Sequence, residues 1–141
     1  MMRRLLFLLL MTFATHGLAE ERILNFHSNI KVHETGDMTV TESITVNAEG
    51  NKIERGIYRD FPTRYKDRYG NSYNVGFTLE KVLRDGSPED FHTKKLSNGI
   101  RIYIGKADRY LNKGQYTYEI TYHTNRQIGF FEDHDELYWN V

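Results

Sequence analysis

Residues 38–46 read Met-Thr-Val-Thr-Glu-Ser-Ile-Thr-Val, and their side chains alternate strictly in character. The even positions are apolar apart from Glu42, and every odd position is threonine or serine. Successive side chains of a strand point to opposite faces of the sheet. This period of two therefore predicts a half-buried β-strand with one apolar and one polar face.

The same alternation recurs along the chain, with turn signals between the alternating segments. The predicted strands cover residues 24–32, 38–46, 75–83, 100–104, 116–122, 127–131 and 136–141. Inside 75–83 a phase change is expected, because Val82 leaves the register of Phe77 and Leu79. The segments outside the strands are two loops and one helical turn, at residues 49–52, 63–74 and 106–112. About seven or eight strands with this spacing predict an all-β, antiparallel β-sandwich, immunoglobulin-like or similar.

Residues 1–19 are built like a secretory signal peptide. Arg3 and Arg4 precede an apolar core of roughly ten residues, and Gly17 and Ala19 are the small residues that a cleavage site requires. The core is shorter than the about 20 residues of a spanning helix. An uncleaved N-terminal anchor is the alternative. Either interpretation exports the domain of residues 20–141 to the periplasm or the extracellular face of the cytoplasmic membrane.

Composition argues against some classes of function. The chain carries 19 Lys and Arg against 19 Asp and Glu, and this balance argues against nucleic acid, which needs a basic surface. It has no cysteine, so the exported domain depends on its core instead of disulfides, as bacterial envelope proteins often do.

No motif in the sequence indicates catalysis or a cofactor. Nucleophile elbows, cysteine nucleophiles and phosphate-cradling glycine loops are absent from the sequence, and we expect no enzyme activity and no cofactor. His134 between Asp133 and Asp135 resembles a metal-binding loop. Adjacent strand residues point to opposite faces and rarely chelate one ion, so no metal site is predicted.

Two segments combine charged and aromatic residues, at 55–65 and 133–141. If residues 57–61 are extended, Arg59 shares a face with apolar neighbours and needs a partner there; the alternative phase buries Asp60 instead. We predict a structural clasp in which Arg59 pairs with Asp135 or Glu136. The competing interpretation is a partner-binding groove. Its predicted residues are Arg55, Tyr58, Arg59, Asp60, Asp135, Tyr138 and Trp139.

Several motifs occur in an order that resembles a known family. They are residues 55–62 (RGIYRDFP), the turn at 85–86, residues 101–105 (RIYIG), residues 114–122 and residues 133–141 (DHDELYWNV). They resemble the extracytoplasmic N-terminal domain of predicted bacterial membrane proteins, the domain of unknown function 2207 family. The resemblance implies that one more strand and then transmembrane helices follow the chain in a longer protein. The resemblance implies no particular activity and no cofactor.

These observations favour a noncatalytic interaction or sensing domain, whose partner is an unknown protein or an envelope glycan. The alternatives are a carbohydrate-binding β-sandwich, a structural spacer for membrane helices, and a hydrolase with two acids across a cleft. An exposed Trp139 would favour glycan binding, and a fully packed one would favour the spacer. The membrane is expected to be reached through the missing C-terminal region, and the sequence leaves the oligomeric state open.

Overall fold

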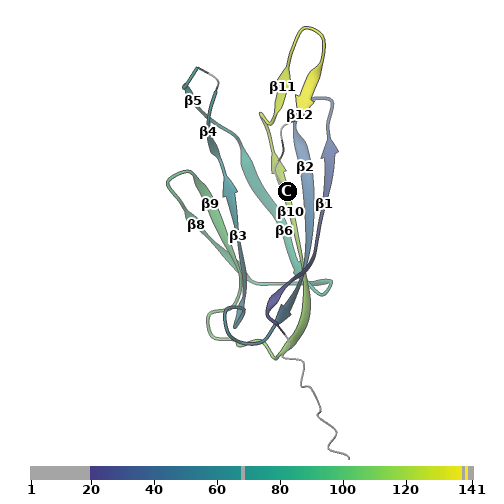
Figure 1. Ribbon diagram of the computed structural model, residues 1–141, viewed down its shortest axis with the longest axis vertical. Helices are drawn as coiled ribbons and strands as arrows, with labels where there is room; N and C mark the ends of the chain where they lie inside the picture. The colour runs from purple at the N-terminus through teal and green to yellow at the C-terminus, as the bar shows by residue number, and fades with distance from the viewer. Residues whose placement is uncertain (1–19, 68, 138, 140–141) are drawn as a thin grey trace, which may run out of the picture.

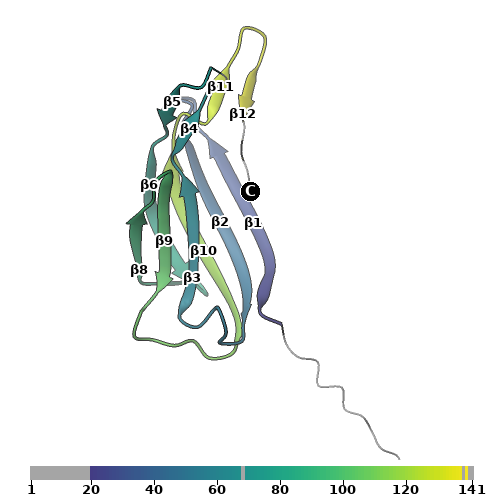
Figure 2. The same ribbon diagram turned by 60° about the vertical axis from the view of Figure 1, so that its left-hand side comes forward.

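The computed structural model describes residues 20–67, 69–137 and 139, and every regular element in these ranges is a β-strand. The strands form two layers that face each other (Figures 1 and 2). The predicted signal peptide, residues 1–19, lies outside the described residues.

The larger layer is a five-stranded antiparallel sheet in the order β1-β2-β10-β6-β7. Its strands are β1 (Arg22–Val32), β2 (Met38–Ala48), β10 (Gly114–Thr124), β6 (Phe77–Arg84) and β7 (Ser87–Pro88). The stretch at 38–46 therefore lies in β2, between β1 and β10, where both of its edges are paired.

The smaller layer is a three-stranded antiparallel sheet in the order β3-β9-β8. Its strands are β3 (Gly56–Pro62), β9 (Gly99–Gly105) and β8 (Phe91–Lys95). Two small hairpins stand at one end of the molecule (Figure 1). They are formed by β4 (Arg64–Lys66) with β5 (Ser72–Asn74), and by β11 (Ile128–Phe130) with β12 (Asp135–Leu137).

The all-β antiparallel class is confirmed, whereas the predicted number of strands is wrong. The described residues contain 12 strands, because short strands such as β4, β5, β7 and β8 add to the long ones. An immunoglobulin-like arrangement in particular stays a prediction. Of the predicted helical turn at 106–112 the structure shows a single turn at residues 107–108, where the Arg109 N–H donates to the Lys106 carbonyl at 3.3 Å, and the rest of the segment is an irregular connection between β9 and β10.

The core lies between the layers and follows the predicted alternation. In β2 every even position is buried and every odd one only partly. Burying one large apolar side chain stabilises the fold by about 1.5–3 kcal/mol. The buried cluster comprises Met38, Val40, Ile44, Val46, Phe61, Val82, Ile102, Ile104, Tyr118, Ile120 and Tyr122. On the outer face threonine hydroxyls pair across strands, with 3.2 Å from Thr41 Oγ1 to Thr121 Oγ1.

Two irregularities of register shape the larger sheet. The predicted phase change in β6 is confirmed by a shift where β6 pairs with Thr121 and Tyr122. A second shift, between Ile23 and Asn25 of β1, was not predicted. It places Ile23, instead of Leu24, on the inner face with Phe26.

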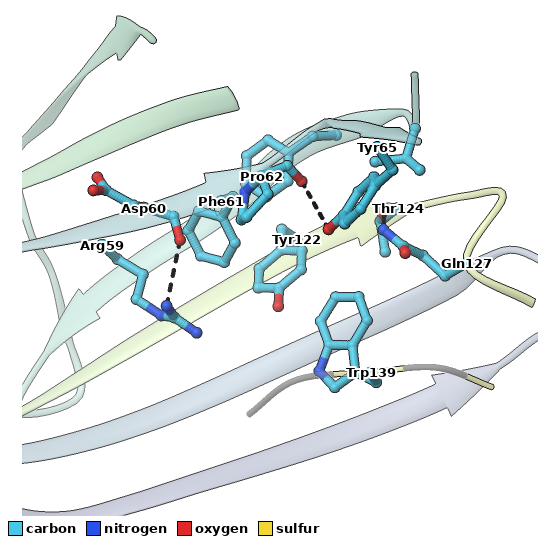
Figure 3. Close-up of a pocket in the computed structure, with 11 residues that line it drawn as sticks. Arg59, Asp60, Phe61, Pro62, Tyr65, Tyr122, Thr124, Gln127 and Trp139 are labelled. Carbon is cyan, nitrogen blue, oxygen red and sulfur yellow. Dashed lines mark hydrogen bonds between the residues drawn. The ribbon is translucent and has the colours of Figure 1, made fainter. Parts of the chain in front are cut away.

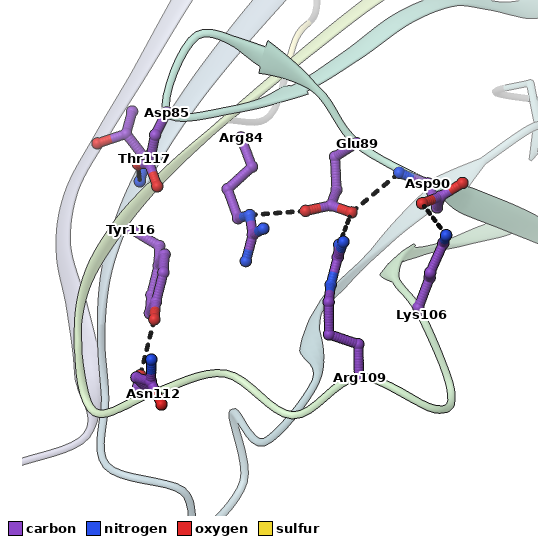
Figure 4. A network of polar contacts seen from close by, with 9 residues as sticks. All are labelled: Arg84, Asp85, Glu89, Asp90, Lys106, Arg109, Asn112, Tyr116 and Thr117. Carbon is purple, nitrogen blue, oxygen red and sulfur yellow. Dashed lines mark hydrogen bonds and ion pairs between the residues drawn. The ribbon is translucent and has the colours of Figure 1, made fainter.

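At the end of the molecule opposite the hairpins, the buried carboxylate of Glu89 connects two segments of the chain (Figure 4). Glu89 follows β7, and its side chain is nearly inaccessible to solvent. The Glu89 carboxylate forms one ion pair with Arg84 Nε at 2.6 Å and a second with Arg109 of the 106–112 connection. A carboxylate out of water requires such partners, so Glu89 anchors this connection to β6.

Candidate functional site

The structure distributes the predicted groove residues over several places. Arg59 and Trp139 point between the layers, while Tyr58 and Asp60 lie on the outer face of the smaller sheet. Asp135 is exposed on β12. The remaining two are Arg55, exposed just before β3, and Tyr138, which lies outside the described residues. Arg59, Asp60 and Trp139 line one hollow, but the other described residues of the predicted groove do not join them there.

Arg59 lies on the inner face of β3 with Ile57 and Phe61, and it pairs with Glu42. Arg59 Nε donates to Glu42 Oε2 at 2.8 Å, and Arg59 Nη2 donates to Oε1 at 2.9 Å. The Tyr122 hydroxyl donates to the same Oε1 at 3.0 Å. Glu42 is only 1% exposed, and these charge-assisted bonds compensate for the loss of its hydration.

The predicted partner of Arg59 is thus wrong, although the two-point clasp exists. Asp135 and Glu136 are exposed on β12, opposite Phe130 and Gly129 of β11. Residues 131–134 turn the chain, so these two segments pair with each other instead of with β3. The signal for the true partner was Glu42 itself, the single charged residue within the apolar row of residues 38–46.

The electrostatics of this cluster favour an intact ion pair. Burial opposes the charge on Arg59, yet the Glu42 carboxylate outweighs burial and raises the pKa of the guanidinium. Burial, together with the same carboxylate, raises the pKa of Tyr122 far above its ordinary value. Tyr122 therefore stays a hydrogen-bond donor at any physiological pH.

A hollow of about 290 Å³ opens beside this cluster, toward the end with the hairpins. Figure 3 shows the Trp139 indole lying against Tyr122, with ring centroids 6.3 Å apart. The Trp139 Nε1–H is buried and has no hydrogen-bond partner among the described residues. The other walls are Arg59, Asp60, Phe61, Pro62, Tyr65, Val75, Phe77, Thr124 and Gln127.

A second hollow, of about 530 Å³, follows along β3 toward the opposite end. Residues 56–59 of β3 line it, whereas residues 59–62 line the first hollow, so the two share Arg59. Its other walls are Ile23, Phe26, Ile44, Val46, Lys52 and Ile53. We call the two hollows together the edge trough.

The edge trough exists because the two layers differ in width. β1 is an edge of the larger sheet and β3 is an edge of the smaller one, so the inner face of β1 is poorly covered. Ile23 is 61% exposed although it faces inward. An edge strand also offers backbone N–H and C=O groups for pairing. The trough can therefore accept apolar side chains beside these strand edges. On β3 the Asp60 and Pro62 carbonyls already accept hydrogen bonds from Arg59 Nη1 and the Tyr65 hydroxyl, so the backbone groups toward Gly56 are the ones that remain for pairing.

Among the described residues, no group of three or more His, Asp or Glu side chains is placed to hold an ion. His134 stacks on Phe131 and contacts Asp133 on the exposed turn between β11 and β12.

Comparison with known proteins gives a family and a relative. A family model described as "Predicted membrane protein (DUF2207) N-terminal domain" matches residues 22–141. The chain is 30% identical over 122 residues to the "Uncharacterized protein YciQ" of Escherichia coli (strain K12), which covers 86% of this chain. The chain spans only 19% of the length of that curated relative. No solved structure matches significantly. In the ranges that the structure describes, no helix is long and apolar enough to cross a membrane.

Proposed function

This chain belongs to the DUF2207 family of predicted membrane proteins, and we propose that it is a noncatalytic interaction domain that binds an extended polypeptide segment in its edge trough. The signal-like residues 1–19 support a location outside the cytoplasm. In the longer protein, occupation of the trough would be relayed to the membrane part.

The observation that carries this proposal is the position of Trp139. Its indole, supplied by a segment of polypeptide, already occupies one end of the trough and stacks on Tyr122. The other end is built in the same way, with apolar walls along the same strand. A site that seats one side chain of a peptide segment beside a sheet edge suits further peptide better than a small polar metabolite.

The chemistry of strand addition matches the trough. A peptide that adds to an edge strand gains main-chain hydrogen bonds, and its alternate side chains, roughly 6–7 Å apart, enter pockets on one face. The edge of β3 supplies backbone groups for the main-chain hydrogen bonds, and the two hollows supply the pockets for the alternate side chains. Arg59 between them favours a polar or acidic side chain at the intermediate position.

Selection from a displayed peptide library tests the proposal, because it presumes no particular partner. We expect the 141-residue chain to enrich peptides with apolar residues at every second position. Ile23→Asp should abolish this enrichment, because it places a charge in the trough at a site exposed enough to leave folding intact. Val32→Asp is the matched control, since Val32 is 48% exposed on the same strand but lines neither hollow.

Equal enrichment by the wild type and both variants would contradict the proposal. No enrichment by any of the three would favour the structural spacer, for which the partly buried Trp139 would be packing alone.

A further inference from the structure

The outer face of the smaller sheet carries an ordered array of rings and charges. Tyr58, Tyr103 and His92 form one row across β3, β9 and β8, because these residues lie opposite one another in the ladder. The next row contains Asp60 and Arg101. Tyr58 is 59% exposed on this face.

Contacts within this array hold it in place. Asp60 accepts two hydrogen bonds from Arg101, at 2.6 and 2.7 Å. The guanidinium carbon of Arg101 lies 4.2 Å from the centre of the Tyr58 ring. The rings of Tyr103 and His92 stack at 4.7 Å with 10° between their planes. Side chains fixed before binding lose little conformational entropy when a ligand arrives.

A cleft of about 340 Å³ adjoins these rings. Tyr58, Tyr103 and His92 line one side of it. The charged residues that line the cleft are Lys52, Glu54, Arg55 and Lys106, three cations against one acid. This excess of positive charge favours an anionic ligand.

The cations of the cleft are held in different ways. Arg55 stacks on and hydrogen-bonds Tyr110, and Lys106 pairs with Asp90 at 3.2 Å. Lys52 is exposed, and its backbone N–H donates to Glu21. A guanidinium and an ammonium on one wall are the usual groups that bind carboxylates and phosphates in proteins.

We propose that this cleft binds an anionic saccharide. The apolar C–H face of a sugar ring would lie against Tyr58, and its carboxylate or phosphate would be bound by Lys52 and Arg55. An acidic peptide would satisfy the cations but gives the rings no role, so the saccharide fits the array better. The cleft shares Lys52 and Tyr58 with the edge trough, whereas Arg55, Tyr103 and His92 line the cleft alone and Ile23 lines the trough alone.

The test measures binding of the whole chain to three polymers by affinity electrophoresis and calorimetry. Polygalacturonate is the anionic saccharide, dextran is the neutral one, and polyglutamate is the anionic peptide. We expect retention by polygalacturonate that weakens with salt and little retention by the other two. The variant Lys52→Gln/Arg55→Gln should bind polygalacturonate about tenfold more weakly or worse.

Two further variants make the result specific. Tyr58→Ala should also weaken binding of polygalacturonate, because the stacking surface is lost. Lys31→Gln, an exposed cation on the other sheet, is the matched control and should bind like the wild type, as should Ile23→Asp of the edge trough. Equal retention by polyglutamate, with no effect of Tyr58→Ala, would overturn the saccharide in favour of an acidic peptide. Absence of polygalacturonate binding would overturn the site altogether.

Discussion

Replacing Arg59 by methionine would leave the Glu42 carboxylate buried without its charged partner. Methionine has a similar length and suits the neighbouring rings, since the Arg59 guanidinium lies 5.5 Å from the Phe26 ring and 5.0 Å from the Phe61 ring. Breaking a buried ion pair from one side costs about 3–5 kcal/mol. The Arg59 side chain is 27% exposed, so water can reach Glu42 in the variant, and we expect the lower end, about 3 kcal/mol.

Urea unfolding followed by fluorescence measures this loss. Trp139 is the single tryptophan of the chain, and it stacks on Tyr122, whose hydroxyl bonds Glu42. With a slope of about 1.5 kcal/mol per molar urea, a loss of about 3 kcal/mol lowers the midpoint by about 2 M. Because the double variant Glu42→Met/Arg59→Met buries no unpaired charge, it should recover much of the loss.

Lys31→Met is the matched control, an exposed cation on β1 whose loss should change the free energy of unfolding by less than about 0.5 kcal/mol. If Arg59→Met were no more destabilising than Lys31→Met, or if the double variant were as unstable as Arg59→Met, the reasoning would be refuted.

Three further predictions concern groups outside this cluster. Burial raises the pKa of Tyr118 to about 12. The contribution of the protonated Tyr118 to stability is complete below about pH 10 and is lost as the pH rises toward 12. Tyr118→Phe should therefore remove one late-ionising group from an absorbance titration of the tyrosines. Hydrogen bonds from Arg101 lower the pKa of Asp60. The contribution of Asp60 to stability is present above about pH 4 and is lost as the pH falls through the lower folded pKa. In Asp60→Asn the thermal unfolding midpoint should therefore depend less on pH in the acid range. Glu89→Gln should cost about 1–3 kcal/mol and speed amide exchange at residues 106–112; unchanged exchange there would contradict the anchoring role of Glu89.

The sequence sufficed for the core because its alternation is strict where one face is buried. Residues 38–46 and 116–122 have the burial pattern that their composition predicts. The register shift at Leu24 could not be predicted from the sequence, because Ile23 and Leu24 are both apolar and either could face inward. The hairpin of β4 and β5 lies in a polar stretch, where Tyr65 stacks on Tyr73, and such a pair becomes visible only once the strands are aligned.

The candidate site was harder to predict, because it depends on which strands face each other. The need of Arg59 for a carboxylate followed from its apolar neighbours, but the sequence offered several acids and no distances. Glu42 is 17 residues away along the chain, and it meets Arg59 only because the layer of β3 packs on the layer of β2. The edge trough likewise follows from the unequal width of two sheets, which no local pattern encodes.

Amide hydrogen exchange of β3, with and without a peptide selected from the library, tests the edge trough most directly. Amides of residues 56–61 that face away from β9 should become protected when the peptide binds, while the outer strand β8 stays unchanged. Protection confined to β8 and β9, or no change along β3, would contradict the account.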